Sequence, residues 1–405
     1  VVIGSGSVLL ASATAELDSF TMSGGTLTFT NWQSSLRASE MQIQGDAVLT
    51  TPEVAVDGEA TNRVYLLCGN LTLGSNAQIN VDEKGYGGGW NSSGKGPGIG
   101  YSAGHGGRGG DNFSSYLGGP VYGEAAAPLG PGSGGKSTDA RSGNLAGNGG
   151  GSVRIIATGH VSIDGSITAD GGASSGYSGC GSGGAIWITC RTFGGGGVLR
   201  AEGKNGWRGG GGGGRIAVTY DAAAQAALPV PRALFSVRGG LTTDGARRQD
   251  ADIGTLYFTD TQFLTPVLKH SGQLMFASDP AGLSFESLTV ENAWLRFQDR
   301  VEYIVVQGDL VVDGVSARLD IGGSGYYTSC GAWRLLNTAS TSAVVHVGGN
   351  LSLTNGGAMF VHPACARAAS LDVAGSLVIS SGSRFRPFCH PTNGMSVVTS
   401  CRNLV

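Results

Sequence analysis

The sequence predicts an all-β fold, and within that class a right-handed parallel β-helix, or solenoid, with long glycine-rich loop insertions. Short runs that alternate apolar and polar residues recur along the 405-residue chain, as they do in strands. A corner of glycine, a polar residue and an aliphatic residue recurs beside these runs. The 73 glycines are concentrated in the region 85–214, between strand-like runs. Stacked coils joined by loops of variable length explain all three features.

The N-terminal strands are expected in 16–32 and 39–56, where apolar and polar residues alternate. The next unit, 63–85, contains a strand, a Gly-Asn-Leu corner, a second strand, a turn and a third strand. The corner has five copies, Gly69-Asn70-Leu71, Gly159-His160-Val161, Gly308-Asp309-Leu310, Gly349-Asn350-Leu351 and Gly375-Ser376-Leu377. Their unequal spacing places insertions between the coils, whereas a β-sandwich would need regular hairpin turns.

The glycine-rich region 85–214 is predicted to be architecture and not a flexible linker. A Gly/Ser linker lacks an apolar period and large side chains, but here strand-like runs lie at 152–159, 185–190 and 215–220. Glycine allows close approach of backbones. We therefore expect loops such as 85–151 to leave the solenoid wall as extended, polyproline-II-like chains.

A soft domain boundary is expected where an alanine-rich run with two prolines, 221–235, breaks the strand pattern. This run is the one helix or linker that the sequence suggests. We assign 1–225 to an N-terminal solenoid that carries the glycine-rich insertions and 245–405 to a C-terminal solenoid segment with a cysteine-rich end. Between them, 226–244 is a candidate linker, and the sequence leaves open whether the solenoid runs through it or restarts beyond it.

An ordered series of glycine-rich pieces resembles a block found in large secreted or cell-surface proteins of bacteria, algae and plants. The pieces are GHGGRGG (104–110), PLGPGSGG (128–135), GNGGGSVRI (147–155), GCGSGGAIWI (179–188) and GGGGGGRIAVTY (209–220). The resemblance implies a β-helical surface protein. Those proteins are mostly uncharacterised and have no agreed catalytic residues, so it implies no site. The cysteine-rich C-terminal region has no counterpart in this resemblance.

Composition argues against several classes of partner. The formal net charge of −3 gives no basic field for nucleic acid. No run of 18 apolar residues suggests a membrane span, and the first residues do not resemble a signal peptide. Because the chain opens at Val1 without Met, we expect a processed or excised segment.

Cysteines and glycosylation sequons favour an extracellular or cell-surface location. The seven cysteines form no CxxC pair, which argues against a zinc site. The disulfide candidates are Cys330, Cys365, Cys389 and Cys401. The glycosylation candidates are Asn70, Asn91, Asn112 and Asn350. Cys68, Cys190 and Cys401 follow strands in the same way, and the first two are predicted to be buried free thiols if they stack in the wall.

No cofactor or metal site is predicted. The run 106–113, GGRGGDNF, resembles a calcium-binding nonapeptide, but one copy cannot complete such a site, so an ordinary loop is expected. We interpret His105 as a hydrogen-bonding loop residue. The tyrosines and tryptophan of the long loop could stack on sugars or another subunit, or could anchor the loop to the wall. They are Tyr86, Trp90, Tyr101, Tyr116 and Tyr122.

The sequence favours a non-catalytic structural or adhesive protein of the cell surface or of an extracellular filament, with further copies or glycans as partners. The alternative is a carbohydrate-active β-helix enzyme, either a polysaccharide lyase or a glycoside hydrolase, or a glycan-binding module. An enzyme needs two or three carboxylates facing one groove, whereas a scaffold scatters them. The candidate sets are Asp164, Asp170 and Glu202, and Asp309, Asp313 and Asp320.

Self-association is expected from the form of the chain's ends. The run 395–405 repeats the form of 63–73 and stops where a second strand should begin, and Val1 starts a bare strand. An unfinished coil exposes unpaired backbone groups. We therefore expect either a longer native chain or head-to-tail docking into filaments.

Overall fold

The computed structural model confirms an all-β parallel solenoid, in which strands account for 43% of the residues and helices for 2%. It describes residues 1–112, 116–138, 145–243, 250–298, 301–322, 344–362, 369–388 and 396–405, and the backbone of 325–327 and 333–335. The chain forms two compact units, Val1–Thr259 (unit 1) and Asp260–Val405 (unit 2).

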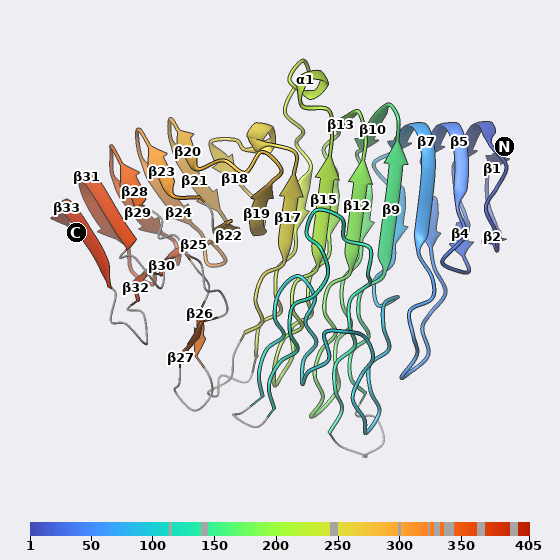
Figure 1. Ribbon diagram of the computed structural model, residues 1–405, viewed down its shortest axis with the longest axis horizontal. Helices are drawn as coiled ribbons and strands as arrows, with labels where there is room; N and C mark the ends of the chain where they lie inside the picture. Colours follow the sequence, from blue (N-terminus) through green and yellow to red (C-terminus); the bar gives the residue numbers. More distant parts are fainter. Residues whose placement is uncertain are drawn as a thin grey trace. The chain divides into compact units, whose positions relative to one another are not determined.

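Unit 1 is built from coils whose strands pair in parallel with the equivalent strands of neighbouring coils (Figure 1). One sheet contains, in spatial order, β1 (Val2–Ile3), β3 (Leu17–Met22), β5 (Leu36–Ile43), β7 (Val64–Leu73), β9 (Ser152–Ala157), β12 (Ala185–Thr189), β15 (Arg215–Thr219) and β17 (Thr255–Phe258). The opposite sheet contains β2 (Ser7–Leu10), β4 (Thr26–Phe29), β6 (Val48–Thr50), β8 (Gln78–Asn80), β11 (Ser166–Thr168), β14 (Val198–Arg200) and β16 (Leu234–Ser236). Two short strands, β10 (His160–Ile163) and β13 (Thr192–Gly194), extend the second half of β7 into a third face.

Parallel, in-register pairing produces the core of unit 1. One inward-facing row pairs Leu66 with Ile155, Ile188, Val218 and Phe258 across five strands, and each of these side chains is buried. Alternate residues face outward, as the period of two in the sequence predicts. Burial of such a row removes apolar surface from water at about 25 cal/mol per Å², so the stacking of coils is driven mainly by the hydrophobic effect.

The repeated corners stack on one another as the sequence alignment predicts. In unit 1, Leu71 pairs with Val161, and in unit 2, Leu310 pairs with Leu351, which pairs with Leu377. All five side chains are buried. The aliphatic residue of the corner is therefore a core residue of each coil.

Where one corner stacks on another, the polar residue of the first explains the glycine of the second. The Oδ1 of Asn70 accepts a hydrogen bond of 2.7 Å from the backbone N–H of His160 in the next coil. An added Cβ on Gly159 would lie 2.2 Å from that same Oδ1. In unit 2, a Cβ on Gly375 would lie 2.6 Å from the Oδ1 of Asn350. Glycine is required at these corners because the side chain of the preceding coil occupies the Cβ position.

The glycine-rich segments are long excursions that leave the solenoid wall of unit 1 after one sheet and return to it at the other sheet (Figure 1). A backbone hydrogen bond of 2.7 or 2.8 Å closes the base of each excursion, from the returning glycine to the outgoing aliphatic residue. The pairs are Gly151 to Val81, Gly184 to Ala169, Gly214 to Ala201 and Gly254 to Val237. Strands therefore enter and leave each excursion at fixed positions.

The returning arms of successive excursions bond to each other. Backbone N–H groups donate from Gly150 to Ser182 at 2.9 Å, and from Gly183 to Gly212 at 2.9 Å. The arms are neither helix nor strand, and lateral bonding of this kind is what extended polyproline-II-like chains offer, because they form no internal hydrogen bonds. The excursions are therefore a packed bundle, as the sequence predicts for 85–214.

Close packing of the arms requires glycine for space. An added Cβ would lie 1.9 Å from a neighbouring carbonyl oxygen at Gly150, 2.0 Å at Gly184 and 1.8 Å at Gly254. None of the three has a left-handed φ. The constraint is thus the distance between backbones and not the torsion angle.

Unit 2 repeats the three-faced coil. One sheet contains β19 (Gly272–Phe276), β22 (Trp294–Phe297), β25 (Arg318–Ile321), β30 (Ala358–Val361) and β32 (Arg384–Pro387). A second contains β18 (Val267–Leu268), β21 (Leu288–Glu291), β24 (Leu310–Asp313), β29 (Leu351–Thr354), β31 (Ala369–Ile379), β28 (Val344–Val347), β23 (Tyr303–Val306), β20 (Gly282–Phe285) and β33 (Val397–Leu404). An antiparallel pair, β26 (Gly325–Tyr327) and β27 (Trp333–Leu335), also belongs to this unit.

The region between the predicted domains differs from the expected linker. A short helix, α1 (Ala222–Gln225), follows β15, with the Asp221 side chain accepting a bond from Ala224 N at its start. The segment 226–244 contains β16, which joins the sheet of unit 1. The boundary between the units lies further along the chain, between Thr259 and Asp260, and unit 2 begins with a 3₁₀ turn, η1 (Thr261–Phe263). No helix among the described residues has the length and hydropathy to cross a membrane.

The close approach of the arms predicts an asymmetry between two glycine substitutions. In Gly184→Ala the new methyl group meets a backbone oxygen that cannot move without breaking bundle hydrogen bonds, so the free energy of unfolding should fall by about 2 kcal/mol or more. In the control Gly196→Ala the nearest atom to the new Cβ is 3.9 Å away, and the change should stay within about 0.5 kcal/mol. Denaturant unfolding measures both, and equal stabilities would contradict the packing role of the glycine.

Candidate functional site

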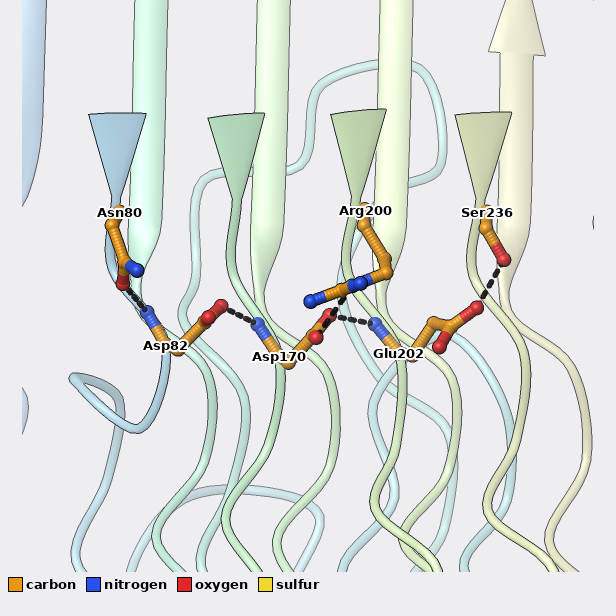
Figure 2. Close-up of polar contacts among 6 residues, drawn as sticks. All are labelled: Asn80, Asp82, Asp170, Arg200, Glu202 and Ser236. Carbon is orange, nitrogen blue, oxygen red and sulfur yellow. Dashed lines mark hydrogen bonds and ion pairs between the residues drawn. The ribbon is translucent and has the colours of Figure 1, made fainter. Parts of the chain in front are cut away.

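An acidic row, consisting of Asp82, Asp170 and Glu202, follows the ends of β8, β11 and β14 (Figure 2). Each side chain lies two residues beyond its strand, where an excursion begins. The backbone N–H of Asp170 donates to Asp82 Oδ1 at 2.7 Å, and that of Glu202 donates to Asp170 Oδ1 at 2.9 Å. Ser236 of the following coil donates its hydroxyl to Glu202 Oε1. The row is therefore a ladder in which each carboxylate binds the next coil.

Asp170 is the buried member of the row. It is 6% exposed, and Arg200 Nε lies 2.6 Å from its Oδ2. Burial and the neighbouring Asp82 carboxylate raise the pKa of Asp170 to about 6, and the Glu202 N–H and the Arg200 charge only partly oppose them. A carboxyl group with this pKa exchanges its proton near neutral pH, which is a property of general acids.

A pocket of about 320 Å³ lies beside the first member of the row. Its lining residues are Glu53, Val54, Asp82, Glu83, Lys84 and Asn148. Lys84 Nζ lies 3.6 Å from Glu53 Oε1 across it. Asp170 is not part of this lining, so the carboxyl group with the raised pKa does not face the pocket. A molecule bound in this pocket would therefore lie beside Asp82 and not against the Asp170 carboxyl group.

The first predicted carboxylate set is only partly assembled. Asp170 and Glu202 lie in the acidic row, but Asp164 lies at the turn after β10, where its Oδ1 accepts a bond of 2.9 Å from Gly196 N. Asp82 was not predicted from the sequence. The available signal was its place two residues after a strand, which Asp170 and Glu202 share.

The second predicted set is not assembled in the structure. Asp309 Oδ1 accepts the backbone N–H of Asn350 at 2.7 Å in a corner of the coil. Asp313 Oδ1 accepts the hydroxyl of Thr354 at 2.6 Å, at the end of β24. Asp320 belongs to β25, in a different sheet. Two of the three carboxylates therefore bind the next coil, as the acidic row does.

Asp320 is instead the centre of a buried ion cluster. Its Oδ1 lies 2.8 Å from Arg318 Nε, and its Oδ2 accepts the indole N–H of Trp294 at 2.8 Å and lies 3.3 Å from Arg296. Burial alone would raise the pKa of Asp320, but Arg318 and Arg296 lower it below its usual value. A carboxylate held ionised among two guanidinium groups is positioned for packing of β22 and β25.

A histidine, an aspartate and a serine lie together on the outer face of unit 2, in the order His346, Asp372 and Ser400 across β28, β31 and β33. His346 Nδ1 lies 2.9 Å from Asp372 Oδ2, and Ser400 Oγ donates to Asp372 Oδ1 at 2.6 Å. The carboxylate binds both partners. Nucleophilic catalysis needs the hydroxyl beside the imidazole, so this arrangement does not activate Ser400.

His105 has a structural contact, as the sequence predicts. It is 1% exposed, and its Nδ1 lies 2.8 Å from Gly183 O in the next excursion. Burial and the nearby Arg215 lower the pKa of His105 to about 3. The imidazole is therefore neutral at physiological pH and pins one arm of the bundle to another.

The calcium-like run 106–113 places Asp111 against a cation of its own loop. Asp111 Oδ1 lies 2.7 Å from Arg108 and accepts the Gly118 N–H at 2.6 Å. Among the described residues, no group of three or more His, Cys, Asp or Glu side chains could hold a metal ion. The geometry fits an internal loop contact.

The aromatic residues of the long loop divide into two groups. Tyr101 is 1% exposed and Tyr122 donates its hydroxyl to Pro131 O within the bundle, so both anchor the loop. Tyr86, half-buried, stays close to Gly96 in the same bundle. Trp90 and Tyr116 are 56% and 40% exposed. Anchoring of the loop thus describes Tyr101 and Tyr122, whereas stacking on sugars or on another subunit stays a prediction for the exposed Trp90 and Tyr116.

The glycosylation candidates differ in accessibility. Asn91 is exposed and has a left-handed φ of 52°, whereas Asn112 is 3% exposed. Asn70 donates its Nδ2 to Glu40 at 2.7 Å, and exposed Asn350 donates its Nδ2 to Asp309 at 3.3 Å. Asn91 is therefore the exposed candidate that does not belong to a corner of the coil, unlike Asn70 and Asn350.

The described cysteines are free thiols, and no disulfide joins them. Cys68 and Cys190 are buried, as predicted, and burial raises the pKa of each thiol to about 12. Cys180 is also buried. Cys401 is half-buried and unpaired, which does not support its candidacy for a disulfide. The other disulfide candidates, Cys330, Cys365 and Cys389, lie outside the described residues.

The raised pKa of Asp170 predicts how stability depends on pH. Its pKa is about 6 in the folded chain and about 4 in an unfolded chain, so folding takes up a proton between these values. The free energy of unfolding should therefore rise by on the order of 1 kcal/mol as the pH falls from 7.5 to 5. In Asp170→Asn this increment should vanish, whereas Asp164→Asn should retain it. Denaturant unfolding at both pH values tests the difference, and a pH dependence unchanged in Asp170→Asn would count against it.

Accessibility predicts which sequon accepts a glycan. When the chain is secreted by a eukaryotic host, folded protein should carry a glycan at Asn91 and none at Asn112, because a glycan at the buried position prevents folding. Glycopeptide mass spectrometry measures occupancy, and Asn91→Gln should remove that modification. Folded protein with a glycan on Asn112 would contradict the expectation.

Comparisons with protein-family models, with curated proteins and with solved structures found no match to this chain. The resemblance of its glycine-rich block to β-helical surface proteins therefore stays a prediction.

Proposed function

We propose that this chain is a non-catalytic structural or adhesive protein of a cell surface or of an extracellular filament. The observation that carries the proposal is the acidic row, in which Asp82 and Asp170 each accept a backbone N–H from the next coil. Side chains that a β-helix enzyme would use for catalysis are here hydrogen-bond acceptors of the scaffold. In unit 2, Asp309 likewise accepts a backbone N–H from the next coil, and Asp313 accepts the hydroxyl of Thr354 there.

The packed bundle supports the same proposal. Its arms are held by backbone bonds, and an added methyl group at many of its glycines would collide with backbone atoms. Such a bundle resists deformation because it has little free volume. Rigid, repetitive architecture of this kind suits a load-carrying or spacing role, in which the chain contacts further copies or glycans.

A carbohydrate-active enzyme is the second candidate, and the raised pKa of Asp170 is the observation that favours it. Against it, Asp170 does not line the pocket beside Asp82. In retaining and inverting glycosidases, two carboxyl groups must flank the scissile bond from opposite sides. The acidic row instead directs each carboxylate toward the next coil (Figure 2).

The decisive experiment incubates the purified chain with polyuronates, sulfated polysaccharides and neutral polysaccharides, and measures new reducing ends and unsaturated products. We expect no cleavage above the level of a matched Asp170→Asn, Glu202→Gln double variant. If the unaltered chain cleaves a polysaccharide and the double variant does not, the enzymatic proposal would replace the structural one. Sedimentation velocity over a range of concentrations tests assembly, for which concentration-dependent larger species are expected.

A further inference from the structure

The outer face of unit 1 carries a row of alternating arginine and aromatic side chains, Trp32, Arg63, Tyr65, Arg154 and Trp187, which we call the arginine row. The Arg63 guanidinium lies 4.8 Å from the Trp32 ring centre and 4.4 Å from that of Tyr65. The Arg154 guanidinium lies 5.6 Å from Tyr65 and 3.9 Å from Trp187. Both cations are therefore held between rings, at distances typical of cation–π contacts.

Strand register places these residues together. Tyr65 of β7 pairs with Arg154 of β9, and Arg154 pairs with Trp187 of β12. Their neighbours on either side along each strand face the core, so the three side chains point outward. Arg63 precedes β7 and is fixed by a bond of 3.0 Å from its Nε to Trp32 O. The row thus runs across the coils on a rigid sheet.

The two guanidinium groups have no counter-ion among the described residues. Neither Arg63 nor Arg154 makes a salt bridge there, although Arg63 is only 9% exposed. Burial lowers the pKa of Arg63, and the nearby charge of Arg154 lowers it further. Two neighbouring, partly desolvated cations without an anion are costly unless something else compensates them.

Unused hydrogen-bond donors accompany these charges. Arg154 Nε and the indole Nε1 of Trp187 are buried and have no hydrogen-bond partner in the part of the chain that the structure describes. A native structure pairs the large majority of its buried polar atoms. On the same face, Thr189 and Thr219 add two hydroxyl groups, which lie 3.1 Å apart. The arginine row and these two threonines therefore offer cations, donors and hydroxyls, and none of these residues is itself a carboxylate.

We propose that the arginine row binds a polyuronate, a polysaccharide that carries carboxylate groups along its chain. Its carboxylates would accept hydrogen bonds from Arg154 and Arg63, which present planar donor edges suited to carboxylates. Its sugar rings would lie over the partly exposed aromatic side chains, and its hydroxyls would face Thr189 and Thr219. This inference names a partner for the proposed structural protein. It rests on the proposed function in one respect, namely that the polymer is bound and not cleaved.

Charge and shape favour a polysaccharide over other anionic polymers. Nucleic acid needs many phosphate contacts to bind, and here two cations stand on a chain of net charge −3. An acidic peptide would seek a groove or an open strand edge, whereas the row lies on the face of a sheet whose strands are paired on both sides. A linear polymer that alternates flat rings and carboxylates matches a linear row of rings and cations.

The test measures binding of the full chain to polygalacturonate and to alginate by calorimetry, with dextran as neutral polymer and a sulfated dextran as the alternative anion. Arg154→Gln should raise the Kd for polyuronate at least about tenfold, because it removes a charge-assisted contact. Trp187→Leu removes the ring over which the Arg154 guanidinium is held, and should raise the Kd about threefold. Binding should weaken with added salt.

The matched control is Arg37→Gln, which removes an exposed arginine of β5 on the same sheet and should leave Kd within about twofold. Circular dichroism checks that each variant is folded. Any of the following results would overturn the inference: no binding of polyuronate, or an equal loss of affinity in Arg37→Gln and Arg154→Gln. Equal affinity for dextran, or a preference for the sulfated polymer or for polyglutamate, would overturn it as well. Shortening of the bound polyuronate, with the Arg154 dependence intact, would contradict the proposed function and the statement that the polymer is not cut, but would still support binding of polyuronate by the arginine row.

Discussion

In-register parallel pairing between coils is the constraint on which the rest of the structure depends. Because every strand pairs with the equivalent strand of the next coil, equivalent residues of successive coils stack on each other. Residues of one chemical type at such a position therefore form a row across the coils. Leu66, Ile155 and Ile188 form an apolar row. Asp82, Asp170 and Glu202 form an acidic one. Even the arginine row follows from this rule, since β7, β9 and β12 supply three of its members.

Pairing also explains why polar residues inside the rows do not act independently. A carboxylate or amide at a corner or a strand end lies one coil away from an unpaired backbone N–H, and it satisfies that group. Asn70 does this for His160, and Asp170 does it for Glu202. Burial then shifts the pKa of Asp170 as a by-product of this structural role. A perturbed pKa alone is consequently a weak indicator of catalysis in a solenoid.

The sequence predicts most of the fold because its signals are local. Alternation identifies the strands, and the glycine, polar, aliphatic corner aligns the coils, so Leu71 and Val161 are correctly paired. The close packing of 85–214 could be predicted because large side chains lie among its glycines. The acidic row was found in part, since Asp170 and Glu202 were candidates while Asp82 was missed. Sequence spacing alone cannot tell which turns stack on each other when insertions between them are long.

The arginine row was not predicted, and the reason is a single residue. Cys68 pairs with Ala157 and Leu71 with Val161, so three steps along β7 correspond to four along the next coil. Aligned on its corner, Arg154 would therefore face inward, because a shift of one residue exchanges the two faces of a strand. Only the pairing of Tyr65 with Arg154 reveals that it faces outward. An irregularity of this size has no signature in composition or periodicity.

The closed base of each excursion has a consequence for how such a chain changes over generations. The bond from Gly151 to Val81 closes a loop of 81–151, and the bond from Gly214 to Ala201 closes a much shorter one, 201–214, in the same way. Since both ends of every excursion are pinned, residues can be gained or lost at its far end while the strands keep their partners, and the entropic cost of a longer loop grows slowly. The solenoid wall can therefore be inherited nearly unchanged while the excursions vary freely in length, so relatives would differ most in the part that looks most uniform in composition.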